Sequence, residues 1–192
     1  MSFLALGSAA NPREARRAFL GTSGLLLSGA AVALLAGRDA LAAKGGASAA
    51  SDVRILNTAL AAELEAIAAY QVGAESGLLQ KPVLALAVQF QGHHKEHADV
   101  LAKTVQKLGG KPVQARARYE FPVEQLTSQA HVLRFAAKLE EGAVSAYLGA
   151  VPLFASRDLS KAAASILGDE AMHWAVLRNA LGENPVPSAF VS

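Results

Sequence analysis

Hydrophobic residues recur at intervals of three and four along four stretches of the chain, as in helices that bury one face. The first stretch spans residues 53–79, and the second runs from about residue 82 to 108, where Gly109 and Gly110 end it. The third covers roughly residues 127–155 and contains Pro152, which we expect to kink or end that helix. The fourth follows a turn at residues 156–160 and runs to Leu181. The pattern predicts an all-α protein.

The links between these four helices differ in length. The first and third links are short, whereas about 16 residues without helical periodicity, 111–126, separate the second helix from the third. Short links join antiparallel neighbours, and a long link lets the chain cross the bundle. The sequence therefore predicts a four-helix bundle with one long crossover between helices 2 and 3.

The ends of this domain have a different composition. Residues 43–52 include the run Lys44–Ala50, rich in Gly, Ala and Ser, which we interpret as a linker, and Ser51 or Asp52 is expected to cap the first helix. Residues 182–192 contain two prolines and form a C-terminal tail that cannot be a fifth helix. We expect the bundle itself to span residues 53–181.

Residues 1–42 have the three parts of a secretory signal: a basic start, an apolar middle and a small-residue end. Arg16-Arg17 precedes Ala-Phe-Leu and an uncharged stretch, and Ala40-Leu41-Ala42 predicts cleavage after Ala42. The paired arginines resemble the twin-arginine export motif, which implies a periplasmic protein exported after folding. The alternative is an uncleaved anchor. Polar dilution and the cleavage site favour removal, so we expect no stable membrane span after processing.

Charge and cysteine content exclude several classes of protein. The pI is about 9.0, but residues 1–42 hold four basic and two acidic residues, and the remainder holds 14 of each. The mature chain thus has no basic excess that would favour binding to nucleic acid. The absence of cysteine excludes disulfides, zinc–thiolate sites and iron–sulfur clusters.

An internal repeat relates the two halves of the bundle. Glu63 and Tyr70 in the first helix recur in the third helix, with the same spacing between them, as Glu140 and Tyr147. His97 in the second helix recurs in the fourth at nearly the same offset as His173, again followed by a similar apolar pattern. Two helical hairpins with the same residues at the same register predict a pseudo-twofold bundle.

The repeated residues match the ligands of a carboxylate-bridged metal pair, which needs one Glu from each of two helices and Glu-x-x-His from each of the others. Residues i and i+3 share a helix face, so both side chains of the motif reach one metal. The fourth helix supplies the full motif, whereas the second has histidine in place of the glutamate. The predicted metal ligands are Glu63, His94, His97, Glu140, Glu170 and His173. His94 is either a ligand or a remnant where a bridging carboxylate was lost.

Tyr70 and Tyr147 each lie two turns after a predicted ligand, on the same helix face. We expect their hydroxyls to hydrogen-bond across the bundle to a carboxylate, with a redox role as the alternative. His93 is interpreted as a structural residue or a partner of a ligand. Met172 is expected in the core.

The mature chain resembles the ferritin-like superfamily, and in particular exported bacterial ferritin-like domains of uncharacterised function. The resemblance rests on the alanine-rich run through Glu63 to Ala69-Tyr70 and on Tyr119-x-x-Pro122, and it covers roughly residues 53–181. It implies a site for two iron ions, or manganese, that reacts with oxygen or peroxide. Three imidazoles with three carboxylates also suit zinc or a single metal ion.

Two functions therefore remain open. The first is a dimetal oxidoreductase, ferroxidase- or peroxidase-like, that handles oxygen, peroxide or ferrous iron. The second is a non-enzymatic scaffold or interaction protein with a degenerate metal site. Position 94 separates them, because a neutral imidazole brings neither the charge nor the second oxygen of a glutamate. A homodimer through a bundle face is expected rather than a storage cage.

Overall fold

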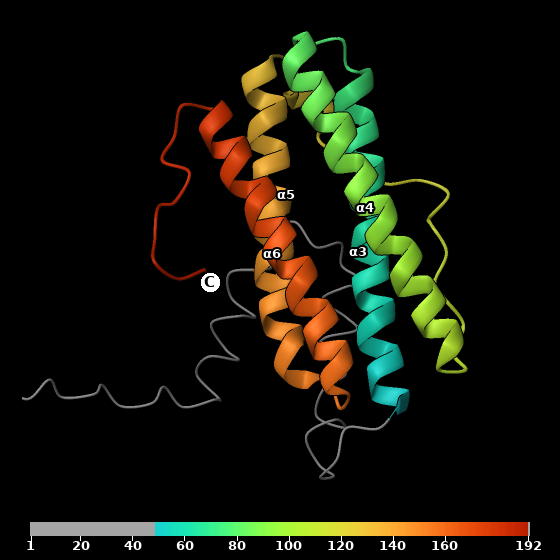
Figure 1. The fold of residues 1–192 in the computed structure, drawn as a ribbon. Helices are drawn as coiled ribbons and strands as arrows, with labels where there is room; N and C mark the ends of the chain where they lie inside the picture. The colour runs from blue at the N-terminus through green and yellow to red at the C-terminus, as the bar shows by residue number, and fades with distance from the viewer. Residues whose placement is uncertain (1–48, 192) are drawn as a thin grey trace, which may run out of the picture.

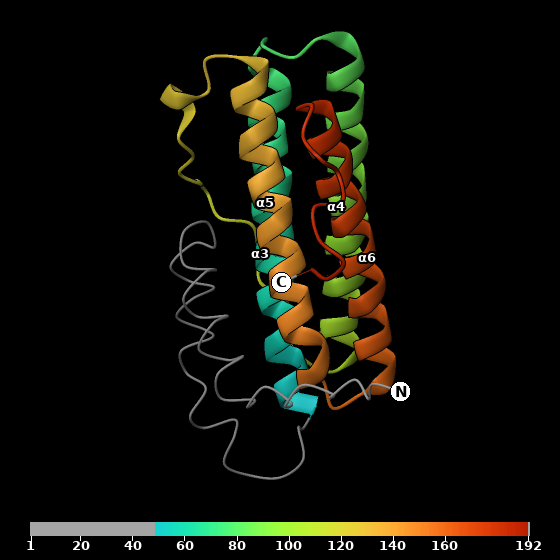
Figure 2. The same cartoon turned by 90° about the vertical axis from the view of Figure 1, so that its left-hand side faces the viewer.

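The computed structural model describes residues 49–191, which form a bundle of four long helices (Figures 1 and 2). Helix α3 spans Ala49–Glu75, α4 Lys81–Lys107, α5 Gln129–Ala150 and α6 Arg157–Ala180. Two single-turn 3-10 helices, η2 (Val123–Gln125) and η3 (Val151–Leu153), lie in the links. The described residues contain no strand, so the all-α prediction is confirmed. The predicted signal peptide, residues 1–42, lies outside the described residues.

The helices pack as two hairpins, α3 with α4 and α5 with α6. The crossover between α4 and α5 returns along the length of the bundle, so α4 and α5 run in the same direction (Figure 1). The result is an up-down-down-up arrangement, in which α3 also contacts α5 and α4 contacts α6. This is the topology that the one long link predicts.

Helices α4 and α6 end in the same way. After α4, Gly109 has a φ of 78°, its N–H donates to the carbonyl of Gln106, and that of Gly110 donates to Val105, both at 2.9 Å. These two bonds define a Schellman cap, which needs a left-handed residue and so favours glycine. Gly182, with a φ of 75°, makes the equivalent cap after α6. The repeat seen in the sequence thus extends to the helix ends.

The start of the first helix differs from the prediction. Helix α3 already includes Ala49, the first described residue, so the last four residues of the predicted linker are helical. Asp52 does not cap α3; its buried carboxylate accepts hydrogen bonds from the N–H groups of Ala155 (2.8 Å) and Ser156 (3.2 Å). Asp52 therefore ties α3 to the α5–α6 link, a tertiary contact that local sequence does not report.

The third and fourth helices also have corrected bounds. Ser128 caps α5 by accepting the N–H of His131, and the helix ends at Ala150, before the 3-10 turn that contains Pro152. Ser156 caps α6 by accepting the N–H of Leu159. The predicted turn at residues 156–160 was wrong from 157 onward, because those residues form the first turn of α6.

The core consists of two apolar clusters with a polar layer between them. Leu60, Leu101 and Ile166 belong to the cluster towards the α5–α6 link, and Phe90 and Leu133 belong to the one towards the α3–α4 link. Buried polar side chains from all four helices occupy the layer between: Glu63, His94, Glu140, Glu170 and His173. Burying charged groups in this way is costly unless they pair or bind a metal, so this layer is the candidate functional site.

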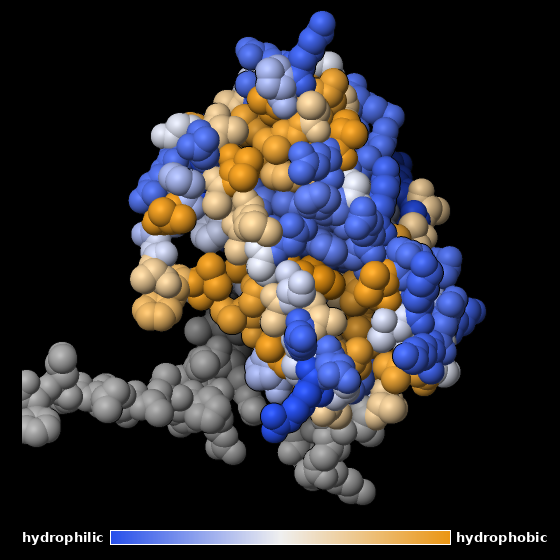
Figure 3. Space-filling view, viewed as in Figure 1, coloured by the Kyte–Doolittle hydropathy of each residue, from blue (hydrophilic) through white to orange (hydrophobic). Residues whose placement is uncertain are grey.

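The surface is mixed in character. In the face seen in Figure 3, hydrophobic residues reach the surface in separate patches divided by hydrophilic ones. Among the described residues, no helix is long and apolar enough to cross a membrane. The expected homodimer stays a prediction.

Candidate metal centre

All six residues predicted as metal ligands meet in the polar layer. Glu63 comes from α3, Glu140 from α5, Glu170 and His173 from α6, and His94 and His97 from α4. Five of them are at most 3% exposed, and the side chain of His97 is 15% exposed. In α6 the two ligands are three residues apart and project from one face, and the same spacing joins the two histidines of α4.

The donor atoms of these residues form two overlapping groups of four. One group is Glu63, His94, His97 and Glu170, and the other is His94, Glu140, Glu170 and His173; within each, the donor atoms lie within 4.8 Å of one another. His94 and Glu170 belong to both groups. Two adjacent groups that share two residues match the arrangement of a metal pair held inside a helical bundle.

His94 lies between the two glutamates that are related by the internal repeat. Its Nδ1 is 2.8 Å from Oε2 of Glu63, and its Nε2 is 3.3 Å from Oε1 of Glu140. Burial alone would lower the pKa of His94, but the hydrogen bonds to Glu140 and Glu63 raise it to about 11. Without metal, His94 is therefore a cation that donates to both carboxylates. It takes the place that the Glu-x-x-His pattern gives to a bridging glutamate.

Other donor atoms of the layer face the centre without hydrogen bonds. Nδ1 of His97, Nδ1 of His173 and both carboxylate oxygens of Glu170 are buried and make no hydrogen bond to any described protein atom. They are nevertheless close to charged neighbours, since Nδ1 of His97 is 3.1 Å from Oε1 of Glu170. Ligand atoms that converge without hydrogen-bond geometry, and that can give up a proton where they carry one, are what a bound cation requires. The donor set therefore fits a transition-metal ion.

The carboxylates of the layer raise the pKa values of its histidines. Burial would lower the pKa values of His97 and His173, but the carboxylates beside them, Glu170 among them, raise both to about 9. Burial would likewise raise the pKa of Glu140, yet the neighbouring imidazoles of His173 and His94 lower it well below its usual range. Without metal, the centre thus holds an ionised Glu140 beside protonated imidazoles.

Two tyrosines cross the bundle to the glutamates, as the sequence predicts. Tyr147 on α5 donates to Oε1 of Glu63 on α3 at 2.5 Å, and Tyr70 on α3 donates to Oε1 of Glu140 on α5. Burial raises the pKa of both hydroxyls, and the charges of the glutamates raise them further, so both tyrosines stay protonated. Each hydroxyl fixes the orientation of one carboxylate.

Asp169 lies beside the ring nitrogens of His97 and His173 that face away from the centre. Its Oδ2 is 3.4 Å from Nε2 of His97 and 3.2 Å from Nε2 of His173. A carboxylate at this position favours a proton on Nε2 of each ring and leaves Nδ1 directed at the centre. His93 lies beside it, with Nδ1 3.2 Å from the same oxygen.

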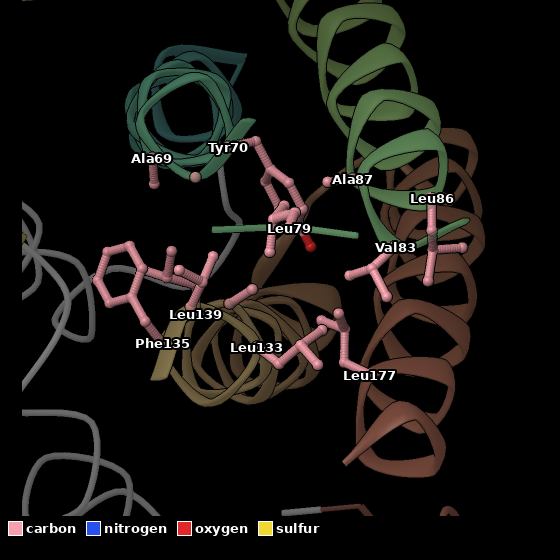
Figure 4. Close-up of a pocket in the computed structure, with 13 residues that line it drawn as sticks. Ala69, Tyr70, Leu79, Val83, Leu86, Ala87, Leu133, Phe135, Leu139 and Leu177 are labelled. Atoms are coloured by element: carbon pink, nitrogen blue, oxygen red, sulfur yellow. The ribbon is translucent and has the colours of Figure 1, made fainter. Parts of the chain in front are cut away.

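An apolar pocket adjoins the centre on the side of Tyr70. Leu79, Val83, Leu133, Leu177 and other apolar residues line it (Figure 4). Its volume of about 20 Å³ is enough to hold one small molecule of the size of water or dioxygen. Because Tyr70 also contacts Glu140, the pocket lies next to the polar layer.

Comparison with known proteins identifies the family. A family model described as a ferritin-like domain matches residues 51–183. The chain belongs to the ferritin-like domain family. The match covers α4, α5, α6 and all but the first two residues of α3, and hence all the residues of the polar layer.

A solved structure has the same fold as this ferritin-like chain. It is the crystal structure of a conserved hypothetical protein, rv2844, from Mycobacterium tuberculosis, with a TM-score of 0.64 and 26% sequence identity. The similarity covers 74% of this chain and 99% of that one. No curated protein matches the chain significantly. These comparisons support the fold and the family and assign no activity.

The sequence did not reveal Asp169 as a residue of the site, and the prediction that Met172 lies in the core was wrong. Asp169 went unnoticed, although its separation from His93 along the chain equals that between His97 and His173. That equal separation was the signal that could have found it. Met172, expected in the core, is 60% exposed. It points outward because its neighbour His173 faces the centre.

Proposed function

We propose that this ferritin-like protein binds metal in the polar layer and acts as a periplasmic dimetal oxidoreductase on oxygen, peroxide or ferrous iron. Iron or manganese fits the donor set, which mixes carboxylate oxygens with imidazole nitrogens. The family resemblance supports this choice of metals.

The observation that carries the proposal is the set of four converging, unpartnered donor atoms on His97, His173 and Glu170. A purely structural polar network satisfies its buried members, because each unsatisfied group costs about 1–3 kcal/mol. Here the most buried carboxylate of the layer, Glu170, is 0% exposed and makes no hydrogen bond among the described residues. A bound cation would remove that cost.

Each side chain then has a defined task. Glu63, His97 and Glu170 would hold one ion, and Glu140, His173 and Glu170 the other. Bound iron or manganese would supply one-electron chemistry towards oxygen or peroxide. Tyr147 and Tyr70 hold Glu63 and Glu140 in place by hydrogen bonds, and the apolar clusters on both sides exclude water. The pocket beside Tyr70 has the size and polarity that suit dioxygen.

A specific observation supports the alternative, a scaffold without enzymatic activity. Protonated His94 bridges Glu63 and Glu140 and supplies the positive charge that a metal would otherwise provide. Such an internal ion-pair network can hold α3, α4 and α5 together without metal. The two functions therefore differ in whether a metal displaces the proton of His94 or leaves it in place.

Addition of ferrous iron to the purified metal-free protein under air tests the proposal. The oxidoreductase account expects new near-ultraviolet absorption and faster oxygen or peroxide consumption than in buffer with iron alone. Glu170→Gln should remove both effects, and Glu96→Gln, an exposed glutamate on α4, should leave them unchanged. Iron oxidation at the buffer rate, with no new absorption, favours the scaffold.

A further inference from the structure

A second cluster of metal-binding side chains lies between α4 and α6, outside the polar layer. His93, Asp169 and His173 present donor atoms that lie within 4.8 Å of one another. The side chain of His93 is 35% exposed and that of Asp169 is 21% exposed, whereas that of His173 is 2% exposed. The cluster therefore runs from the surface to the edge of the buried centre.

His173 belongs to both clusters through its two ring nitrogens. Nδ1 faces inward, 3.5 Å from Oε1 of Glu140. Nε2 faces outward, 2.9 Å from Nδ1 of His93 and 3.2 Å from Oδ2 of Asp169. One imidazole thus separates an inner site from an outer one.

The outer donor atoms have the spacing of ligands on one small cation. Ligand atoms on a tetrahedral ion with bonds of about 2.0–2.1 Å lie about 3.3–3.4 Å apart. Nε2 of His173 lies 2.9 Å from Nδ1 of His93 and 3.2 Å from Oδ2 of Asp169, and both separations are close to this value. Phe90 stacks on the ring of His173, with centroids 4.0 Å apart, and so holds its outer nitrogen in position. Two imidazoles and a carboxylate suit zinc, ferrous iron or cobalt.

We propose that His93, Asp169 and Nε2 of His173 form an outer site for a divalent transition-metal ion, from which the buried centre is loaded. When an ion binds there, Nε2 of His173 releases its proton to solvent, and with both sites filled the ring bridges them as an imidazolate. The existence of the outer site depends only on this cluster; its role in loading rests on the function proposed above. Asp169 is the contact point between the two sites, because its Oδ2 also lies 3.4 Å from Nε2 of His97. An ion bound there touches a histidine of the inner site and still reaches solvent beside His93.

The proposal has one structural competitor. Asp169 could serve solely to orient His97 and His173, with His93 as a bystander. His93 distinguishes the two accounts, because it contributes a donor atom to the outer cluster and to neither inner group. It is also partly exposed, so its replacement should not disturb the fold.

Co²⁺ binding to the purified protein tests the outer site, with bound metal counted after rapid desalting and followed by visible absorption. We expect His93→Ala to bind one Co²⁺ fewer per chain than the wild type and to fill the buried centre several-fold more slowly. Asp169→Asn should lose the same ion. The control is His131→Ala, which removes an exposed histidine that lies in the first turn of α5 and in neither cluster. Circular dichroism verifies that each variant is folded.

The possible results separate this proposal from the function of the buried centre. If the buried centre binds nothing, the wild type still binds one Co²⁺ and His93→Ala binds none. If His93→Ala binds as many ions as the wild type, the outer site is overturned. If it loses one ion but the buried centre fills at the wild-type rate, the loading role is overturned.

Discussion

The hydroxyl of Tyr147 donates a hydrogen bond of 2.5 Å to Oε1 of Glu63, from one half of the internal repeat to the other. The repeat predicts an equivalent contact in the other half, and the hydroxyl of Tyr70 makes it with Glu140. In the sequence, the pseudo-twofold relation appears as the equal spacing of glutamate and tyrosine in the two halves. In the structure, it appears as two reciprocal contacts between α3 and α5. Both contacts end on a carboxylate of the candidate centre.

We predict that Tyr147→Phe destabilises the metal-free protein by about 1–3 kcal/mol, because Oε1 of Glu63 loses its buried donor. Tyr70→Phe should cost a similar amount through Glu140. Urea unfolding followed by circular dichroism gives the free energies. Tyr119→Phe, in the crossover, is the control: among the described residues its half-buried hydroxyl accepts only the N–H of Arg116, at 3.2 Å, so its loss should cost less than either core substitution. Equal stability of the wild type and both core variants would show that these bonds do not support the layer.

The topology and the six central residues followed from the sequence, because helix periodicity reports which side chains share a face. Glu63 and Glu140 share a register with the tyrosines, and Glu170 with His173, so their convergence needed only the bundle topology. Their role as metal ligands stays a prediction.

Other features depend on contacts between distant segments. Asp52 accepts hydrogen bonds from Ala155 and Ser156, which lie in the other half of the chain, and so could not be told from a helix cap. Asp169, directly before Glu170, has the appearance of an exposed acid until the bundle brings His93 and His97 next to it. Local patterns identify faces, and packing of the helices against one another determines which groups meet.

The protonation of the metal-free centre predicts how metal binding depends on pH. The pKa values of His97 and His173 are raised to about 9 from 6.5, so both hold a proton at neutral pH in the absence of metal. A metal must displace these protons, and its apparent affinity should therefore rise as the pH increases from about 6.5 towards about 9. The stability of the metal-free protein should change in the opposite direction. It should fall as the pH rises through about 9, because the stabilising charge on these rings is then lost.

Calorimetric titration of Co²⁺ in buffers of different ionisation enthalpy measures this proton release directly. Net release of protons at neutral pH is the expected outcome. An affinity independent of pH, with no proton release, would contradict the predicted ionisation of the centre.

His94 should make the two halves of the centre unequal. A glutamate would add a negative charge and a second ligand oxygen, whereas a neutral imidazole offers one nitrogen and no charge. The sequence alone predicts that the ion near His94 is the weaker or is absent; since His94 belongs to both donor groups, we predict that one of the two ions is bound more weakly or is absent, and that His94→Glu raises iron occupancy towards two per chain in the buried centre. Metal analysis in a His93→Ala background keeps the outer cluster from contributing. Unchanged occupancy, with no peroxide reactivity in either form, would leave the scaffold as the function.

Export by the twin-arginine route is predicted from the leader, which lies outside the described residues. Replacing Arg16 and Arg17 together by lysine should trap the unprocessed protein inside the cell. Immunoblots of cytoplasmic and periplasmic fractions measure the outcome, and Arg13→Lys is the matched control, because Arg13 lies outside the pair. A double variant that reaches the periplasm at its normal size would contradict this route of export.

The most direct test of the central claim is the metal content of protein recovered from its native cells, compared with Glu170→Gln made in the same way. Glu170 takes part in both inner groups and not in the outer cluster, so its replacement removes the buried centre alone. We predict iron or manganese in the wild type, loss of that metal in Glu170→Gln, and retention in Glu96→Gln. Wild-type protein with no metal above background, or with a metal content that Glu170→Gln leaves unchanged, would contradict the account.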